Sequence, residues 1–587
     1  MASTSVLSSF KKLFHILNVS EKRQLIMAAS MAFFVALMEV ITAISIALFA
    51  QSLVRPENVY MHLHKYHLIK TGFNPQQILL YMAILCGVTY LIKNVGASFD
   101  VFHQNKVIQR IGLNIKKRLL QKYMGLSYEK YITRNSSIPL SVMNTDINRA
   151  INYGLVQMMG IFSEGLVFVI LIAFIVYVNP VFALVIFAVG ALIALLMIKY
   201  LLPLSYRLGD NLSTSTKATN FHLVQLLHTF KEVVLAAKEA KFSKSYNEQA
   251  VTMADANCLF NVFQHFPRII IETIFIGLFV LSVVYLCLTK QSSAHIMALM
   301  GGYLYAAFRL MPGLNRIITQ LNNAKSAIKS IDMVDEEFKL NDDTLQSLQS
   351  VTDFSFTSMI RLQDVNFKYA SEDRMILQHI NLTISKGECV GVVGSTGSGK
   401  STLIDLMLGL LQPTSGDITI DGKYPVNCRQ WHEMIGYVPQ SLNLIDDSIK
   451  ANIAFGDETE LVDERHIASL IKQVQLTHLV AKLEKGVETP VGERGVQLSG
   501  GERQRIAIAR ALYTDPDVLI FDEATSALDT ETESQMMETI YSVAKDHTVI
   551  MVAHRISTLK GCDRIFVFEE GALKSVTTYD ELIEETI

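Results

Sequence analysis

Six long apolar runs fall within the first 317 residues of the chain, separated by polar stretches. A helix of about 20 apolar residues crosses the hydrocarbon core of a bilayer, so each run predicts one membrane-spanning helix. The pattern therefore predicts an α-helical membrane domain over residues 1–330. The six predicted spans are residues 25–48, 78–102, 155–178, 182–202, 263–288 and 295–317.

Basic residues indicate the orientation of these spans. The loop between the second and third spans, from Lys106 to Arg134, is rich in lysine and arginine. By the positive-inside rule this loop lies in the cytoplasm, and so does the N-terminus. The loop at residues 205–261 is long and polar and lies on the same side. We expect short helices near residues 137–147 and 213–221 to dock on a second domain; the alternative is that they are ordinary connectors.

Composition supports a membrane protein. Half of the 587 residues are apolar and only 18% are charged, which is too apolar for an ordinary soluble protein. The net charge of −3 gives no reason to expect a nucleic-acid partner, because no basic stripe lies outside the membrane-flanking loops. We expect an acidic linker at residues 331–358 and a second domain at residues 359–587.

A glycine-rich loop is the first chemical motif of this second domain. It lies between an apolar strand, residues 390–393, and the start of a helix. Glycines let backbone N–H groups turn toward phosphates, and the helix N-terminus favours anions. We expect Lys400 to reach the β- and γ-phosphates of ATP, and the Ser401 hydroxyl to bind Mg²⁺. The predicted nucleotide-binding residues of this loop are Gly394, Ser395, Thr396, Gly397, Ser398, Gly399, Lys400, Ser401 and Thr402.

A second apolar strand, residues 518–521, leads into two acids. We expect Asp522 to orient Mg²⁺ through water, and Glu523 to polarise the attacking water as the general base. The alternative is a structural acid. His554 is predicted to hydrogen-bond the γ-phosphate. Gln440 is predicted to contribute to the Mg²⁺ site and to lie where the nucleotide site meets the membrane domain.

The order of the motifs is typical of one class of ATPase. Residues 498–502, Leu-Ser-Gly-Gly-Glu, lie between the phosphate loop and the acidic pair, and the whole chain resembles a half-size ATP-binding-cassette (ABC) exporter. The resemblance implies a six-helix transmembrane domain of the type I exporter kind, with helices extending into the cytoplasm, followed by an α/β nucleotide-binding domain. Ser499, Gly501 and Asp529 would face a second cassette, so a homodimer is the simplest assembly. Tyr369 is expected to stack on adenine; a core tyrosine is the alternative.

Cations within the spans are candidates for contact with the cargo. A charge in hydrocarbon is costly, so such residues are functional candidates by default. Arg268 has Glu272 four residues away as a possible partner. The others have no carboxylate at helical spacing and are expected to face water or an anionic ligand. The candidate substrate-cavity residues are Lys93, Arg268, Arg309 and Arg316.

Residues 305–318 resemble the sixth span of the PglK family, bacterial flippases of polyprenyl-diphosphate-linked oligosaccharides. This resemblance implies a lipid-linked oligosaccharide as cargo, a cationic cavity surface and a place in the bacterial inner membrane, with the N-terminus and the cassette in the cytoplasm. Lys93 stands where that family is expected to have arginine. The alternatives are export of lipid A-like lipids, drugs or peptides, a non-transporting ABC ATPase, and a channel gated by ATP.

Overall fold

The computed structural model describes residues 6–54, 57, 59, 75–134, 137–178, 199, 202–288, 312–340, 351–370, 373–458, 462–492, 495–523, 530–553 and 555–586. The chain divides into two compact units. The first, called the membrane unit below, comprises residues 1–124 and 136–341. The second, called the cassette unit, comprises residues 125–135 and 342–587.

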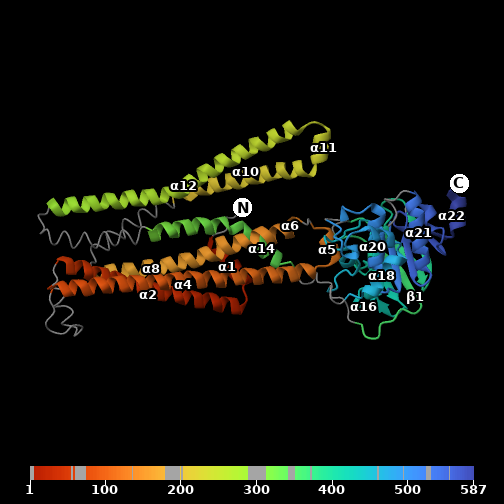
Figure 1. Cartoon of the computed structure of the whole chain (residues 1–587), viewed down its shortest axis with the longest axis horizontal. Helices are drawn as coiled ribbons and strands as arrows, with labels where there is room; N and C mark the ends of the chain where they lie inside the picture. The colour runs from red at the N-terminus through yellow and green to blue at the C-terminus, as the bar shows by residue number, and fades with distance from the viewer. Residues whose placement is uncertain are drawn as a thin grey trace. The chain divides into compact units, whose positions relative to one another are not determined.

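The membrane unit is helical throughout its described part (Figure 1). Its elements are α1 (Val6–Ile16), α2 (Val19–Val54), α4 (Pro75–Met124), α6 (Ser137–Ser141), the π-helical turn η1 (Val142–Asp146), α7 (Ile147–Arg149), the π-helical turn η2 (Ala150–Leu155), α8 (Val156–Val178), α10 (Leu202–His228), α11 (Phe230–Leu235), α12 (Glu239–Leu288) and α14 (Ile328–Phe338).

Three of the described helical stretches are long and apolar enough to cross a membrane, namely Val19–Ile46, Gln76–Met124 and Ile138–Ala173. They contain most of the first three predicted spans. The fifth predicted span lies within α12. The predicted fourth and sixth spans, residues 182–202 and 295–317, fall mostly outside the described residues.

Small side chains allow the membrane helices to pack closely. α2 packs along both α4 and α8, and α10 packs along α12 (Figure 1). Ala28, Ala32 and Ala36 of α2 are at most 2% exposed and follow one another at intervals of four residues. This spacing places them on one face of the helix, where alanine lets neighbouring backbones approach.

The structure describes both predicted docking segments as helical parts of the membrane unit, and their docking on a cassette stays a prediction. Residues 137–147 belong to the membrane unit, where the Ser330 hydroxyl of α14 donates to Asp146 Oδ1 at 2.7 Å. Residues 213–221 lie inside the continuous helix α10. A further helix, α5 (Tyr128–Ile132), was not predicted and belongs to the cassette unit.

α14 occupies the first part of the predicted acidic linker. Its Asp332 Oδ1 lies 2.6 Å from Lys12 Nζ of α1, and its Glu337 Oε2 accepts a 2.8 Å hydrogen bond from the Tyr123 hydroxyl of α4. Ile331 and Val334 are fully buried. Two acidic residues of α14, Asp332 and Glu337, therefore pair with other helices of the membrane unit, which an acidic composition alone does not reveal.

The described part of the cassette unit contains two sheets. The smaller is antiparallel, in the order β2-β1-β4-β5, and the larger has the order β10-β9-β3-β8-β7-β6, with β9, β3, β8, β7 and β6 parallel. The strands are β1 (Met359–Phe367), β2 (Leu377–Ser385), β3 (Cys389–Gly394), β4 (Ser415–Ile420), β5 (Tyr424–Pro425), β6 (Ile435–Val438), β7 (Val518–Asp522), β8 (Thr548–Val552), β9 (Arg564–Glu569) and β10 (Ala572–Thr577). The helices are α15 (Lys400–Met407), α16 (Arg429–Glu433), α17 (Ile449–Ile453), α18 (Glu464–Gln473), α19 (Thr477–Lys482), α20 (Gly500–Leu512), α21 (Thr530–Ala544) and α22 (Tyr579–Thr586), with the 3₁₀ turns η5 (Gly486–Glu488) and η7 (Ile556–Leu559).

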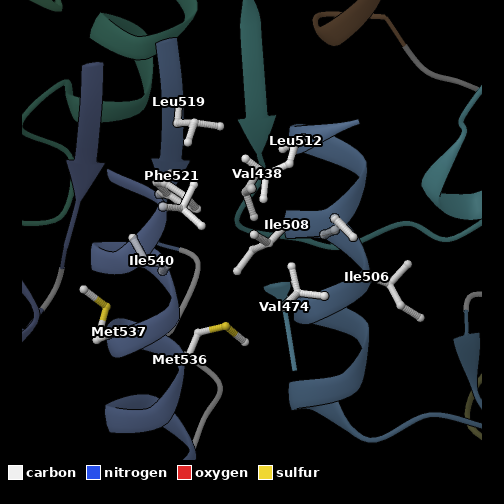
Figure 2. Packing of buried hydrophobic residues seen from close by; sticks show 14 of the residues in the cluster. Val438, Val474, Ile506, Ile508, Leu512, Leu519, Phe521, Met536, Met537 and Ile540 are labelled. Atoms are coloured by element: carbon white, nitrogen blue, oxygen red, sulfur yellow. The ribbon is translucent and has the colours of Figure 1, made fainter. Parts of the chain in front are cut away.

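α20 is held against the larger sheet by an apolar core. Ile508 and Leu512 of α20 lie next to Val438 of β6, and Leu519 and Phe521 of β7 belong to the same cluster (Figure 2). Every residue of β7 is buried, as expected for a central strand of a parallel sheet. This packing places the start of α20 and the end of β7 on one rigid framework.

Candidate active site

The candidate active site lies where parallel strands of the larger sheet end. The phosphate loop follows β3, Asp522 ends β7, and Gln440 follows β6 by two residues. Ligands of parallel α/β sheets bind at the carboxyl ends of the strands, and all three features meet that rule. The order of the parallel strands in the sheet therefore brings these segments, which are distant in sequence, to the same edge.

Two glycines of the phosphate loop are required by its backbone path. Gly399 is the N-cap of α15 at φ +94°, and a Cβ there would lie 2.6 Å from Leu377 Cδ2. A Cβ on Gly394 would lie 2.4 Å from the Phe568 carbonyl oxygen. Lys400 Nζ donates to the carbonyl oxygens of Gly394 and Ser395 at 2.8 and 3.1 Å. The loop therefore wraps around the lysine at the N-terminus of a helix, an arrangement suited to phosphate.

The acidic pair has the electrostatics of a cation site. Asp522 is 6% exposed, and its Oδ1 is buried without a hydrogen-bond partner within the described part of the chain. Burial, followed by the charge of Glu523, raises the pKa of the Asp522 carboxyl, against smaller opposite effects of Tyr437 and Lys400. Glu523 accepts a short hydrogen bond from Gln440 Nε2. The structure thus brings Gln440 to the two acids.

These residues fit a bound Mg²⁺. A buried carboxylate oxygen with no partner among the described residues, next to a second carboxylate, is the hard oxygen donor set that this ion prefers. Ser401, Asp522 and Gln440 are the residues that would hold it. When bound with ATP, Mg²⁺ neutralises charge on the phosphates.

Two polar residues near Asp522 were not predicted from the sequence. Burial and then the charge of Asp522 raise the pKa of Asp405 in α15 to about 6. The Tyr437 hydroxyl of β6 donates to Asp522 Oδ2 at 3.5 Å. Asp405 lies four residues after Ser401, so helical spacing could have placed both on one face. Tyr437 carries no such signal, because its proximity depends on β6 pairing with β7.

Ser499 begins α20 as its N-cap. Its hydroxyl accepts from the Glu502 backbone N–H at 3.3 Å, and Glu502 Oε2 accepts from the Ser499 backbone N–H at 2.7 Å. This reciprocal pair is a capping box, which starts the helix at a defined residue. Ser499 is exposed and Gly501 half-buried. An exposed helix start can face a separate cassette.

Of the remaining predicted cassette residues, the structure describes Tyr369 but not Asp529 or His554. The Tyr369 hydroxyl lies 3.4 Å from Thr402 Oγ1, and its ring meets the edge of Phe367 with centroids 5.0 Å apart. Tyr369 therefore lies beside the helix of the phosphate loop, and its stacking on adenine stays a prediction. Asp529 and His554 fall outside the described residues.

Two predicted substrate cations are paired with carboxylates. Lys93 Nζ lies 3.3 Å from Glu39 Oε2, and Arg316 Nε lies 2.7 Å from Glu164 Oε1. Sequence spacing could not reveal these carboxylate partners, because they lie on neighbouring helices. Contact of either cation with the cargo stays a prediction. The Arg268 side chain and the whole of Arg309 fall outside what the structure describes.

Comparisons with known proteins agree with this architecture. Residues 25–300 match the ABC transporter transmembrane region, and residues 377–526 match the ABC transporter ATPase family. The ATP-dependent lipid A-core flippases of Saccharophagus degradans and Mannheimia succiniciproducens are each 28% identical, over 86% and 88% of both chains respectively. The α-hemolysin translocation ATP-binding protein HlyB of Escherichia coli O157:H7 is 43% identical over 38% of this chain and 32% of its own.

A solved structure shows the same fold. A bacterial Atm1-family ABC exporter with ATP bound superposes with a TM-score of 0.73 at 23% identity, covering 97% of each chain. The predicted fold class, a transmembrane exporter domain followed by an α/β nucleotide-binding domain, is confirmed. The chain is a half-size ABC exporter, a membrane protein whose cassette hydrolyses ATP with Mg²⁺ to drive transport.

Proposed function

We propose that the cargo is an amphipathic lipid with an anionic headgroup, of the lipid A type. The observation that carries this proposal is the similarity to lipid A-core flippases over 86% to 88% of the chain. These relatives favour the alternative reading of the sequence, export of other lipids, over a lipid-linked oligosaccharide. We also propose, as the resemblance to the PglK family implies, that the transporter lies in a bacterial inner membrane with its N-terminus and cassette in the cytoplasm.

Arg316 is the described cation best suited to meet such a headgroup. Its side chain is 44% exposed although it pairs with Glu164, whereas the Lys93 side chain is only 12% exposed beside Glu39. An exposed guanidinium can bind a phosphate with two parallel hydrogen bonds. Lys93 is placed to stabilise helix packing, so we assign the headgroup contact to Arg316.

Reconstitution with defined lipids tests the cargo. We expect a lipid A-type lipid to stimulate the ATPase and to cross proteoliposome membranes, and Arg316→Ala to weaken this transport several-fold. Lys241→Ala, at an exposed cation of α12, is the matched control. If only a polyprenyl-diphosphate-linked oligosaccharide is moved, the lipid A proposal is wrong and the original reading is restored.

We further propose that two copies of the chain form a homodimer with two composite ATP sites. The exposed start of α20 at Ser499 supports this, because one cassette's α20 can then complete the phosphate loop of another. A mixed dimer of Ser499→Arg and Lys400→Ala chains places both defects in one site. It should hydrolyse ATP at about half the native rate, while each pure variant is inactive. A mixture no more active than its parents would refute the composite site.

A further inference from the structure

A buried polar cluster lies between α4 and α8, apart from the ATP site. Asp100 of α4 is 5% exposed and Gln104, one turn later, is 8% exposed. Gln104 Nε2 donates to Asp100 Oδ2 at 2.9 Å and to Ser163 Oγ of α8 at 3.3 Å. One amide thus joins the acid to the neighbouring helix.

Next to Asp100 in sequence, α4 also carries exposed apolar side chains. Phe99, Val101 and Phe102 are 58%, 59% and 64% exposed. Large apolar residues in this position are expected to face lipid, and the second predicted span includes Asp100. The carboxyl group therefore points into the helix bundle at membrane level, where an uncompensated charge is costly.

Two atoms of the cluster have no partner within the described part of the chain. Asp100 Oδ1 and His103 Nδ1 are both buried and unpaired there. The two residues are three apart on α4, so their side chains share a face. The cluster therefore offers two buried atoms that can bind a proton, a carboxylate oxygen and an imidazole nitrogen.

The charged residues on the adjacent helices do not neutralise Asp100. On α8, Glu164 pairs with Arg316. On α2, Glu39 pairs with Lys93. A bound metal ion would need several oxygen ligands, and Asp100, Gln104 and Ser163 offer too few.

We propose that Asp100, His103, Gln104 and Ser163 form a proton-binding site within the membrane, in which Asp100 holds the proton at neutral pH. The site goes beyond lipid export and does not depend on which lipid is moved. Binding forms an O–H bond on Asp100 with a proton taken from water, and release returns the proton to water. The packing of α4 against α8 is then stable while Asp100 is protonated. It weakens as pH rises through the range in which Asp100 ionises.

Infrared spectroscopy of the full-length transporter in lipid tests the site directly. A protonated aspartic acid gives a C=O stretch separate from the carboxylate bands. We expect this band at neutral pH, shifted by ¹³C-labelled aspartate and lost in Asp100→Asn. Asp255→Asn, at an exposed position of α12, is the control and should leave the band unchanged. In addition, the thermal midpoint of the native chain should fall with rising pH more steeply than that of Asp100→Asn.

Each result is decisive. A band that is absent from the labelled native protein at neutral pH overturns the proposal, and so does a band that persists unchanged in Asp100→Asn. If Asp100→Asn does not fold, the pH titration of the ¹³C-shifted band in the native protein decides instead. Its persistence through neutral pH and loss in alkali support the site, and ionisation in the range of an exposed aspartate refutes it.

Discussion

At the scale of single residues, the two acids that follow one another at the end of β7 have different surroundings. Asp522 has a buried oxygen without a partner in the described chain, as a metal-binding group requires. Glu523 accepts a hydrogen bond from Gln440, and its φ of +49° turns it out of the strand direction. The structure therefore separates the residue that would hold Mg²⁺ from the one that would activate water.

Glu523→Gln should retain ATP binding and lose most hydrolysis. Removal of a general base typically costs about 10²–10⁴-fold in rate. ATP turnover and nucleotide binding by the purified transporter provide the measurement. Glu538→Gln, at an exposed position of α21, is the control. Near-native turnover of Glu523→Gln would show that this side chain is not the base.

Asp405 predicts a pH dependence for the nucleotide-free, Mg²⁺-free protein. Its pKa of about 6 lies above the ordinary 3.8. A carboxyl whose folded-state pKa is raised stabilises the fold at low pH, and this stability is lost as pH rises through about 6. Asp405→Asn should therefore raise the thermal midpoint near pH 8 but not near pH 4. Asp417→Asn, which is exposed, should show no such difference. An equal change at both pH values would contradict the assignment.

At the scale of elements, α5 is the cassette unit's link to the preceding membrane helix. α4 ends at Met124 in the membrane unit, and α5 follows after three residues. Glu129 Oε1 accepts from the Ala370 backbone N–H at 2.7 Å, next to Tyr369. The Tyr128 side chain packs against the apolar core that the two sheets share. A five-residue helix has too little periodicity for detection from sequence, whereas the long apolar runs of α2, α4 and α8 were readily predicted.

Loss of the α5 contact should uncouple transport from hydrolysis. Glu129→Ala removes the acceptor for the Ala370 N–H, while Glu129→Gln keeps an oxygen there. We expect the alanine variant to keep basal ATPase but to lose lipid-stimulated ATPase and transport several-fold, since one hydrogen bond contributes about 1 kcal/mol. The glutamine variant should remain close to native, as should Lys130→Ala at an exposed neighbour. Equal effects of Glu129→Ala and Glu129→Gln would argue against this contact.

The Glu39–Lys93 pair joins α2 to α4, and its removal tests whether Lys93 serves packing or cargo. Lys93→Met removes the ammonium group 3.3 Å from the buried Glu39 carboxylate, and removing one partner of a buried ion pair typically costs about 3–5 kcal/mol. We expect a clear fall in thermal midpoint, restored in Lys93→Met with Glu39→Gln, because both charges are then gone. If the double variant regains stability but not transport, Lys93 also contacts cargo and the packing assignment is incomplete.

At the scale of the whole molecule, motifs formed by residues close in sequence were predictable, whereas side-chain contacts between distant elements were not. The phosphate loop, the acidic pair and the start of α20 each depend on neighbours in sequence, and their elements were found where expected. Asp405 with Asp522, Lys93 with Glu39, and Arg316 with Glu164 depend on packing between elements. The first part of the predicted linker became α14 because its apolar side, Ile331 and Val334, is buried by other helices.

ATP-dependent movement of a lipid A-type lipid tests the central claim most directly. The full-length transporter is reconstituted in proteoliposomes, and the fraction of labelled lipid exposed on each leaflet is followed with and without ATP and Mg²⁺. We predict movement that requires both, that is lost in Glu523→Gln and that is kept in Glu538→Gln. Active ATP hydrolysis without any ATP-dependent lipid movement would contradict the account.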